Sequence, residues 1–274
     1  LLVKILFGKV VVTIHDVHSF TSNEKSLLIQ KIIYKLTDLI LTHNNFSRLE
    51  IQKLKMDLSS DIHIVPHGNY IPFIGDSLDK DLSRNFLKIS KDKKVVLFFG
   101  MIKQVKGLEI VLRSLKNVIS MHPDILLVIA GKVWKNDFSV YQQIIDKEGL
   151  QKYCLIHNKF IKQDDVPHYY AASDLVVLPY KRIYQSGVLM MALSYERPVL
   201  VSDLPPLKEV ITDGKSGFIF KSEDVESLSN KLRETLSNTH ILEQVRINGF
   251  NLVNNKYDWH EIGRITKEAY KTID

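Results

Sequence analysis

Short apolar runs rich in β-branched residues recur along the chain from Val95 onward. The six runs are VVLFFG, LLVIAG, YCLIHN, LVVLPY, PVLVSD and GFIF. Continuous apolar runs of this length are typical of parallel strands that are buried on both faces. Between them, apolar residues at helical spacing predict helices over 107–121, 139–149, 187–195 and 224–236. This alternation predicts an α/β fold, with a Rossmann-like domain over 95–257 whose helices cover both faces of a parallel sheet.

The first 75 residues show the same alternation over a shorter length. Strand-like VVVTIHD, LILTH and IHIVPHG are separated by segments that predict helices over 24–36 and 46–56. Three strands without an opening βαβ unit leave one sheet edge unpaired. We therefore expect residues 1–75 to form part of an N-terminal Rossmann-like domain that is incomplete, with a further N-terminal portion in the native protein.

Two polar or amphipathic segments complete the predicted organisation. Residues 76–94 are rich in Asp, Ser and Lys, which predicts an interdomain linker with one short helix. Residues 258–274 predict a C-terminal helix that packs back on the N-terminal domain through Ile262, Ile265 and Tyr270.

Composition limits the partners. With 37 basic and 31 acidic residues among 274, the net charge of +6 is modest, and no helix carries a basic stripe, so we expect no nucleic-acid partner. The single cysteine, Cys154, supports neither a disulfide framework nor a cysteine-based metal site and favours the reducing cytoplasm.

No apolar run reaches the length of about 18 uncharged residues that a membrane span requires, so any membrane contact is expected to be peripheral. Five lysines on the predicted N-terminal helices favour contact with an anionic membrane at the inner face of the plasma membrane, although an ordinary solvated face explains them equally well. They are Lys25, Lys31, Lys35, Lys53 and Lys55.

Two predicted strands end in features of an anion site. The segment FFGMIKQVKG places Lys103 and Lys106 after Gly100 and before a helix, and LVVLPY leads to a helix that begins at Ser186, Gly187 and Val188. A helix start presents unpaired N–H groups and the positive end of the helix dipole. We expect both lysines and the backbone of 186–188 to bind a diphosphate; the alternative is that the lysines are solvated loop charges.

These motifs, in their order and spacing, resemble the retaining nucleotide-sugar glycosyltransferases of the large family-4 (group 1) type, over nearly the whole chain. The resemblance rests on VVTIHD, IHIVPHG, FFGMIKQVKG, LLVIAG, ASDLVVLPY, QSGV followed by ERPVLVSD, and Glu209. It implies the GT-B architecture, in which two Rossmann-like domains face each other across a cleft. It also implies sugar transfer, with retention, from a nucleoside-diphosphate donor to a glycan or lipid-linked acceptor in cell-surface polysaccharide synthesis.

The resemblance implies no metal and no other cofactor. A leaving diphosphate must be stabilised by a divalent ion or by fixed cations and dipoles. The predicted donor domain has no Asp-x-Asp pair at a strand end, but it has the two lysines and the helix start.

The resemblance also assigns roles to single residues. His15 matches the family's active-site histidine, which faces the transferred sugar, and the neighbouring Asp16 is of second rank. His67 is also of second rank because the family often has a structural turn at that position. Gly100, Gln185 and Glu209 are expected near the donor sugar or nucleotide. For Glu209, expected at the start of a helix, stabilisation by the helix dipole is the alternative.

The chain departs from the family at one place. Typical members carry two glutamates separated by seven residues, but here the second position falls at Met191 and the first within 183–185, and neither is acidic. A subgroup with a Q-S-G-V loop, in which Gln185 contacts the sugar, explains the change. A non-catalytic nucleotide-sugar-binding partner or a truncated remnant also explains it. A nucleotide-sugar epimerase fits less well, because acid and base groups near the sugar are scarce.

Overall fold

The computed structural model describes residues 8–18, 29, 32–54, 61–135 and 137–273. Within it the chain forms two compact units. The N-terminal unit runs to Gly68 and includes Ile183–Ser186 and Lys256–Asp274, whereas the C-terminal unit comprises Asn69–Arg182 and Gly187–Asn255. Most of the predicted helix over 24–36, and Lys25, Lys31 and Lys55, lie outside the described residues.

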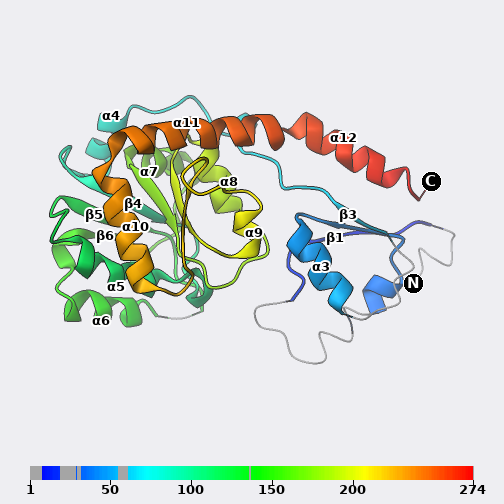
Figure 1. Ribbon diagram of the computed structural model, residues 1–274, viewed down its shortest axis with the longest axis horizontal. Helices are drawn as coiled ribbons and strands as arrows, with labels where there is room; N and C mark the ends of the chain where they lie inside the picture. Colours follow the sequence, from blue (N-terminus) through cyan, green and yellow to red (C-terminus); the bar gives the residue numbers. More distant parts are fainter. Residues whose placement is uncertain (1–7, 19–28, 30–31, 55–60, 136, 274) are drawn as a thin grey trace. The chain divides into compact units, whose positions relative to one another are not determined.

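A parallel sheet of six strands forms the centre of the C-terminal unit (Figure 1). The strand order is β6-β5-β4-β7-β8-β9, and every neighbouring pair is parallel, so all carboxyl ends lie at one edge. The six predicted strands and their parallel arrangement are confirmed. Their bounds are β4 Lys94–Phe99, β5 Ile125–Ala130, β6 Cys154–His157, β7 Leu175–Leu178, β8 Val199–Ser202 and β9 Phe218–Phe220.

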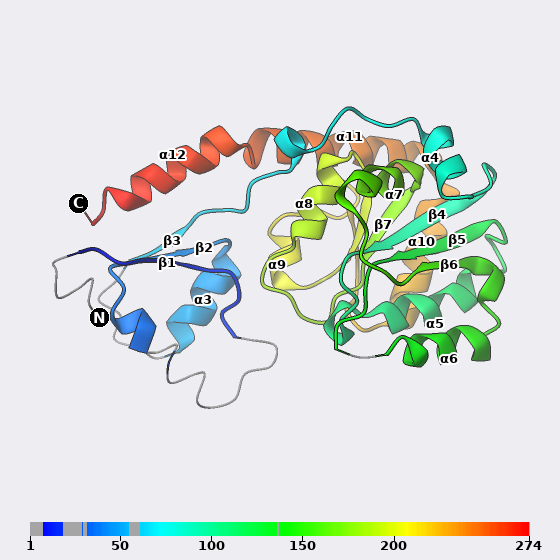
Figure 2. The ribbon, with the colours of Figure 1, turned by 180° about the vertical axis from the view of Figure 1, so that it is seen from behind.

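Helices cover both faces of this sheet (Figures 1 and 2). One layer holds α5 (Leu108–Val118), α6 (Ser139–Lys147) and α10 (Val225–Ser237); the other holds α4 (Lys80–Phe86), α7 (Val166–Ala172), α8 (Gly187–Ser194) and α11 (Thr239–Lys256). Helix α5 shows why these layers form. Leu108, Val111, Leu112 and Leu115 recur at helical spacing and are completely buried in the core that includes Phe98 and Leu127.

The segment predicted as a linker, 76–94, lies inside the C-terminal unit. Its helix α4 packs on α7 and buries the guanidinium of Arg84. Nη2 of Arg84 donates to Oδ2 of Asp174 at 2.9 Å, Nη1 donates to the Lys91 carbonyl at 2.6 Å, and the Val95 N–H donates to the same Asp174 oxygen at 2.7 Å. The linker was predicted from polar composition. Composition does not reveal that an arginine is buried with each of its three guanidinium nitrogens hydrogen-bonded.

The N-terminal unit contains a parallel sheet in the order β1-β2-β3, and α3 and α12 pack against it. Successive side chains of β2 point to opposite faces. Ile40 packs in one cluster with Ile51 of α3, and Leu39 and Leu41 pack in another with Ile262 of α12. The bounds are β1 Val11–Ile14, β2 Leu39–Thr42, α3 Asn45–Lys53, β3 Asp61–Ile64 and α12 Trp259–Tyr270.

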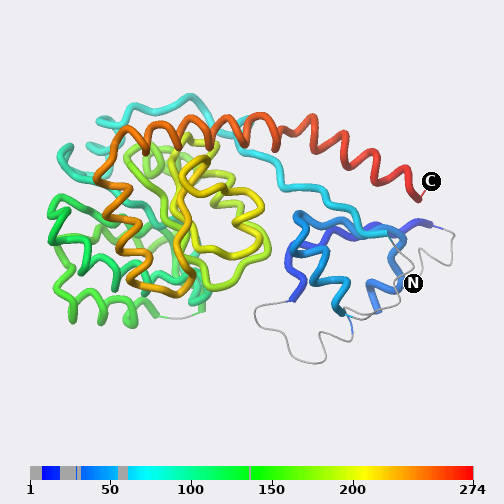
Figure 3. Tube along the Cα trace, viewed as in Figure 1, coloured from blue at the N-terminus to red at the C-terminus, as the bar shows by residue number. Residues whose placement is uncertain are grey.

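Along the chain, helix α12 follows α11 after Tyr257 and Asp258 and is drawn in red in Figure 3. Asp258 caps it, since its carboxylate accepts from the His260 N–H at 2.8 Å. Ile262 and Ala269 are buried against the sheet, with Ile265 partly buried beside them. The prediction that Tyr270 contributes to this packing is wrong, because Ala269 occupies the buried stripe and Tyr270 is 45% exposed.

Candidate functional site

The sheet order of the C-terminal unit places a topological switch point between β4 and β7. From β4 the chain proceeds through β5 to β6 in one direction, and from β7 through β8 to β9 in the other. Ligands of open parallel sheets bind beyond the carboxyl ends of the strands at such a point. Gly100 directly follows β4 and Pro179 directly follows β7, so the loops that bear the predicted residues meet there.

Backbone contact holds these two loops together. The Lys181 N–H donates to the Val105 carbonyl at 2.8 Å, and Lys181 forms an ion pair with Glu109 of α5. Gly107 has a left-handed φ of +67°, and a Cβ at this position would lie 2.0 Å from the Pro179 carbonyl oxygen. Only glycine fits both the conformation and the approach.

Lys106, Gly100 and the start of α8 converge at this point. A Cβ on Gly100, whose φ is +96°, would lie 3.2 Å from Nζ of Lys106 and 3.4 Å from Cγ2 of Val188. Nζ of Lys106 also lies 5.4 Å from the centre of the Tyr180 ring. Gly187 is the first residue of α8, so an ammonium group and the N–H-rich start of a helix lie together, as an anion requires.

Lys103 has different neighbours from Lys106. Its Nζ lies 5.4 Å from the centre of the Trp134 ring, and the backbone N–H of Trp134 donates to the Ile102 carbonyl at 3.0 Å. Lys103 therefore belongs with the loop that follows β5. Trp134 was not among the residues predicted from the sequence, although an aromatic residue in the loop after LLVIAG was the available signal.

Three histidines follow the three strands of the N-terminal unit: His15 after β1, His43 after β2 and His67 after β3. Nε2 of His43 lies 2.9 Å from Nδ1 of His15, and Nδ1 of His43 lies 2.9 Å from the Val65 carbonyl oxygen. The His67 ring centre lies 6.0 Å from that of His43, and its Nδ1 donates to the Gly68 carbonyl at 2.7 Å. His15 and Asp16 are exposed.

His15 and His67 were among the residues predicted from the sequence, but His43 was not. The signal was present, since LILTH ends in a histidine as VVTIH does. Burial lowers the pKa of His43 below its usual 6.5; the bond to the Val65 carbonyl opposes this, and the charges of His15 and His67 lower it further.

The family model described as Glycosyl transferases group 1 matches residues 79–251, which include the convergent loops. The chain belongs to this family. Among curated relatives, spore coat protein SA of Bacillus subtilis is 26% identical over 189 residues, covering 65% of this chain and 49% of that protein. CapM of Staphylococcus aureus, a capsular polysaccharide biosynthesis glycosyltransferase, is 22% identical over 208 residues, covering 75% and 53%. The chain thus spans about half the length of these curated relatives.

Solved structures show the same fold. HepE of Anabaena, in complex with UDP and glucose, superposes with a TM-score of 0.83 at 16% identity, covering 99% of this chain and 73% of HepE. Sucrose-phosphate synthase of Thermosynechococcus elongatus gives a TM-score of 0.81 at 16% identity, covering 97% and 68%. The predicted GT-B type of α/β fold is confirmed.

In this member of the glycosyl transferases group 1 family, Gln185 and Ser186 belong to the N-terminal unit, whereas Gly187 belongs to the C-terminal unit. Tyr184, next to Gln185, is buried with Ile14 and Ile40, and its carbonyl accepts from Nδ2 of Asn44 at 2.5 Å. Oε1 of Gln185 is buried and has no hydrogen-bond partner among the described residues. A buried amide oxygen without a partner can accept a hydrogen bond from an N–H or O–H group of a ligand.

Glu209 does not lie at the start of a helix, so that prediction is wrong. Helix α9 (Pro205–Lys208) begins at Pro205, because two consecutive prolines suit the first helical positions. Glu209 is the residue that ends α9, and its N–H donates to the Pro205 carbonyl at 3.1 Å. Glu209 is therefore not placed to be stabilised by the N-terminus of α9.

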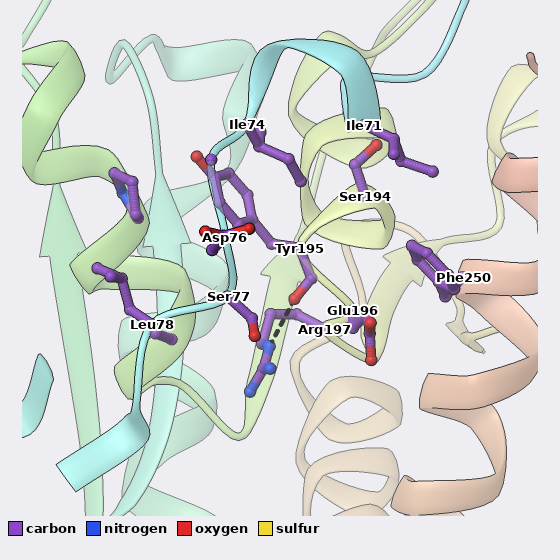
Figure 4. Close-up of a pocket in the computed structure, with 13 residues that line it drawn as sticks. Ile71, Ile74, Asp76, Ser77, Leu78, Ser194, Tyr195, Glu196, Arg197 and Phe250 are labelled. Carbon is purple, nitrogen blue, oxygen red and sulfur yellow. Dashed lines mark hydrogen bonds between the residues drawn. The ribbon is translucent and has the colours of Figure 1, made fainter. Parts of the chain in front are cut away.

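A cavity of about 670 Å³ lies elsewhere in the C-terminal unit (Figure 4). The residues that line it are Ile71, Ile74, Gly75, Asp76, Ser77, Leu78, Pro167, Ala171, Ser194, Tyr195, Glu196, Arg197 and Phe250. Residues 195–197 lead into the amino end of β8, so the cavity lies at the sheet edge opposite the convergent loops. Since ligands of this fold bind at the carboxyl edge, we do not assign the donor to this cavity.

Within the described ranges, no cluster of three His, Cys, Asp or Glu side chains is arranged to hold a metal ion. No helix among those same residues has the length and apolar character needed to cross a membrane.

Proposed function

We propose that this protein is a glycosyltransferase that moves a sugar from a nucleoside diphosphate to a glycan or lipid-linked acceptor in cell-surface polysaccharide synthesis. The observation that carries the proposal is the convergence of Lys106, Gly100 and the first residues of α8 at the switch point. The capsular polysaccharide role named for CapM supports a glycan acceptor. The complex of HepE with UDP supports a nucleoside-diphosphate donor.

The convergent loops supply what the leaving group needs. As the bond between the sugar and the diphosphate breaks, negative charge grows on the diphosphate oxygens. The Lys106 ammonium and the backbone N–H groups of Ser186, Gly187 and Val188 stabilise this charge, so that no divalent ion is required. Gly100 has no side chain, which lets the diphosphate approach the strand end. Lys103 and Trp134 contact the nucleotide beside it.

The remaining roles concern the sugar and the acceptor. Gln185 donates its amide N–H groups or presents its unpaired oxygen to the donor sugar, and His15 contacts a hydroxyl near the transferred carbon. The acceptor oxygen bonds to the sugar on the face that the diphosphate leaves, which retains the anomeric configuration. Its proton passes to the diphosphate oxygen that was bonded to the sugar.

A second candidate is binding of a nucleotide sugar without transfer. The observation that favours it is Met191, an uncharged residue of α8 at the position where typical members carry a glutamate. The two candidates agree on the donor site and differ only in turnover.

The test measures release of nucleoside diphosphate by the protein expressed from its complete reading frame. UDP-, GDP- and ADP-sugars are incubated with undecaprenyl-linked and free glycan acceptors in EDTA, and proton NMR assigns the anomer of the product. The proposal predicts release from one nucleotide class in EDTA and a product with the donor's configuration. Release only with a divalent ion, or an inverted product, would contradict the mechanism, and binding without release would favour the second candidate.

A further inference from the structure

The hydrogen bonds of His43 fix the position of its proton. A carbonyl oxygen can only accept, so the contact of Nδ1 with the Val65 carbonyl at 2.9 Å requires a proton on Nδ1. Burial of the ring favours the neutral form of His43. In the neutral imidazole with a proton on Nδ1, Nε2 carries a lone pair and acts as an acceptor.

This arrangement determines the tautomer of the next ring. Nε2 of His43 lies 2.9 Å from Nδ1 of His15, and the ring centres are 4.7 Å apart. Because Nε2 of His43 accepts, Nδ1 of His15 must donate and carry a proton. Neutral His15 then has its lone pair on Nε2, the nitrogen at the far side of the ring. The chain from Val65 through His43 to His15 is thus ordered in one direction.

Among the residues that the structure describes, no carboxylate is one of the side chains that act electrostatically on His43. The side chains that act electrostatically on it are His15 from the end of β1 and His67 beyond β3, and both are histidines. Nδ1 of His67 is occupied by the Gly68 carbonyl at 2.7 Å. A carbonyl therefore takes the place at His43 that a carboxylate takes in many histidine relays.

We propose that His43 is a positioning residue that holds His15 in the tautomer whose Nε2 can accept a hydrogen bond from a hydroxyl of the donor sugar or the acceptor. The inference rests on the proposed function for the role of His15, but the tautomer itself follows from the N-terminal unit alone. Because His43 is half-buried, neutral and bonded to a carbonyl, it orients the His15 ring without adding charge to the site.

The first test is nitrogen-15 NMR of the histidine side chains, which reports protonation at each ring nitrogen. At pH 8, His43 and His15 should both show the proton on Nδ1, whereas free histidine favours Nε2. A His15 ring protonated on Nε2 would overturn the inference. This measurement needs no turnover, so it remains decisive if the protein transfers no sugar and the proposed function fails.

Two substitutions separate positioning from a structural role. In His43→Gln the amide group occupies the place of Nε2 and can still accept from His15, but the bond to Val65 is lost. In His43→Asn the amide occupies the place of Nδ1 and can still bond to Val65, but nothing accepts from His15.

We expect kcat to fall by about 10- to 100-fold in His43→Asn, a fraction of the usual contribution of proton transfer by a positioned side chain. The KM for the donor should stay unchanged, and His43→Gln should retain most of the kcat. The reverse order, with Asn active and Gln impaired, would show that His43 only links β2 to Val65 and would overturn the inference. Circular dichroism confirms that each variant is folded before kcat is compared.

Discussion

Gly107 offers a direct test of the contact that joins the two loops of the candidate site. A Cβ at this position would lie 2.0 Å from the Pro179 carbonyl oxygen, well inside any tolerated contact, and φ is +67°. Gly149 provides a matched control, because its φ is +66° and a Cβ there would meet nothing within 4 Å. Both glycines belong to the C-terminal unit.

The two alanine variants share one cost and differ in the other. A left-handed backbone costs an L-residue about 1–2 kcal/mol relative to glycine, and this applies to both positions. Forcing extra volume into a packed site costs about 1–3 kcal/mol more, and this applies only to Gly107→Ala. The free energy of unfolding should therefore fall by about 1–2 kcal/mol in Gly149→Ala and by about 2–5 kcal/mol in Gly107→Ala.

Urea denaturation followed by circular dichroism measures both values, and the difference between the variants isolates the Pro179 contact. Calorimetric scans provide a second measurement, since about 2–4 °C of Tm corresponds to 1 kcal/mol in a domain of 150–250 residues. Equal destabilisation of the two variants would refute the close approach of the loops. It would also remove the structural basis for placing Lys106 beside the strand end.

Three further predictions concern partly buried side chains. Asp174→Asn should lower the free energy of unfolding by about 1.5–3 kcal/mol in urea titrations, because the buried Arg84 loses its charged partner at 2.9 Å; an unchanged midpoint would contradict this pairing. Burial raises the pKa of Cys154 to about 12, so the thiol should resist a thiol-specific disulfide reagent at pH 8 until urea unfolds the protein, and rapid native labelling would contradict the burial. The pKa of His43 in the folded protein is lowered from 6.5, so as the pH falls the His43 ring is protonated in the unfolded chain before it is protonated in the folded one. The free energy of unfolding should therefore decrease as the pH drops below about 6.5. His43→Gln should show a shallower pH dependence of this free energy, and an unchanged slope would refute the lowered pKa.

The strands of the C-terminal unit were predicted well because all six appear as continuous apolar runs, of which the central four, β4, β5, β7 and β8, are largely buried. Loop contacts were harder to predict, since they depend on which strands are neighbours. Lys103 and Lys106 looked equivalent in FFGMIKQVKG, yet the parallel bridge between Ile102 and Val133 turns Lys103 toward Trp134. Sequence spacing carries no information on such a bridge between distant loops.

Two other differences have local physical causes. Glu209 was expected to begin a helix, but the prolines start α9 four residues earlier and leave Glu209 at its end. His43 was missed because one strand-end histidine is unremarkable by itself. Its meaning appears only when the register of β1, β2 and β3 brings three such histidines to the same edge.

We expect Lys106 to bind a nucleoside diphosphate at the switch point. Isothermal titration calorimetry in EDTA would compare binding of UDP, GDP and ADP by the wild type, Lys106→Ala and Lys152→Ala. Lys152 is a suitable control, because its Nζ also lies over an aromatic ring, 5.0 Å from the centre of Tyr153, but it precedes the amino end of β6.

A hydrogen bond to a charged group contributes about 1.5–3 kcal/mol, which corresponds to roughly 10- to 100-fold in Kd. We predict that one nucleotide binds the wild type without metal, that Lys106→Ala weakens its binding by this factor, and that Lys152→Ala leaves it unchanged. Equal affinity in the wild type and Lys106→Ala, or binding that appears only with a divalent ion, would contradict this prediction.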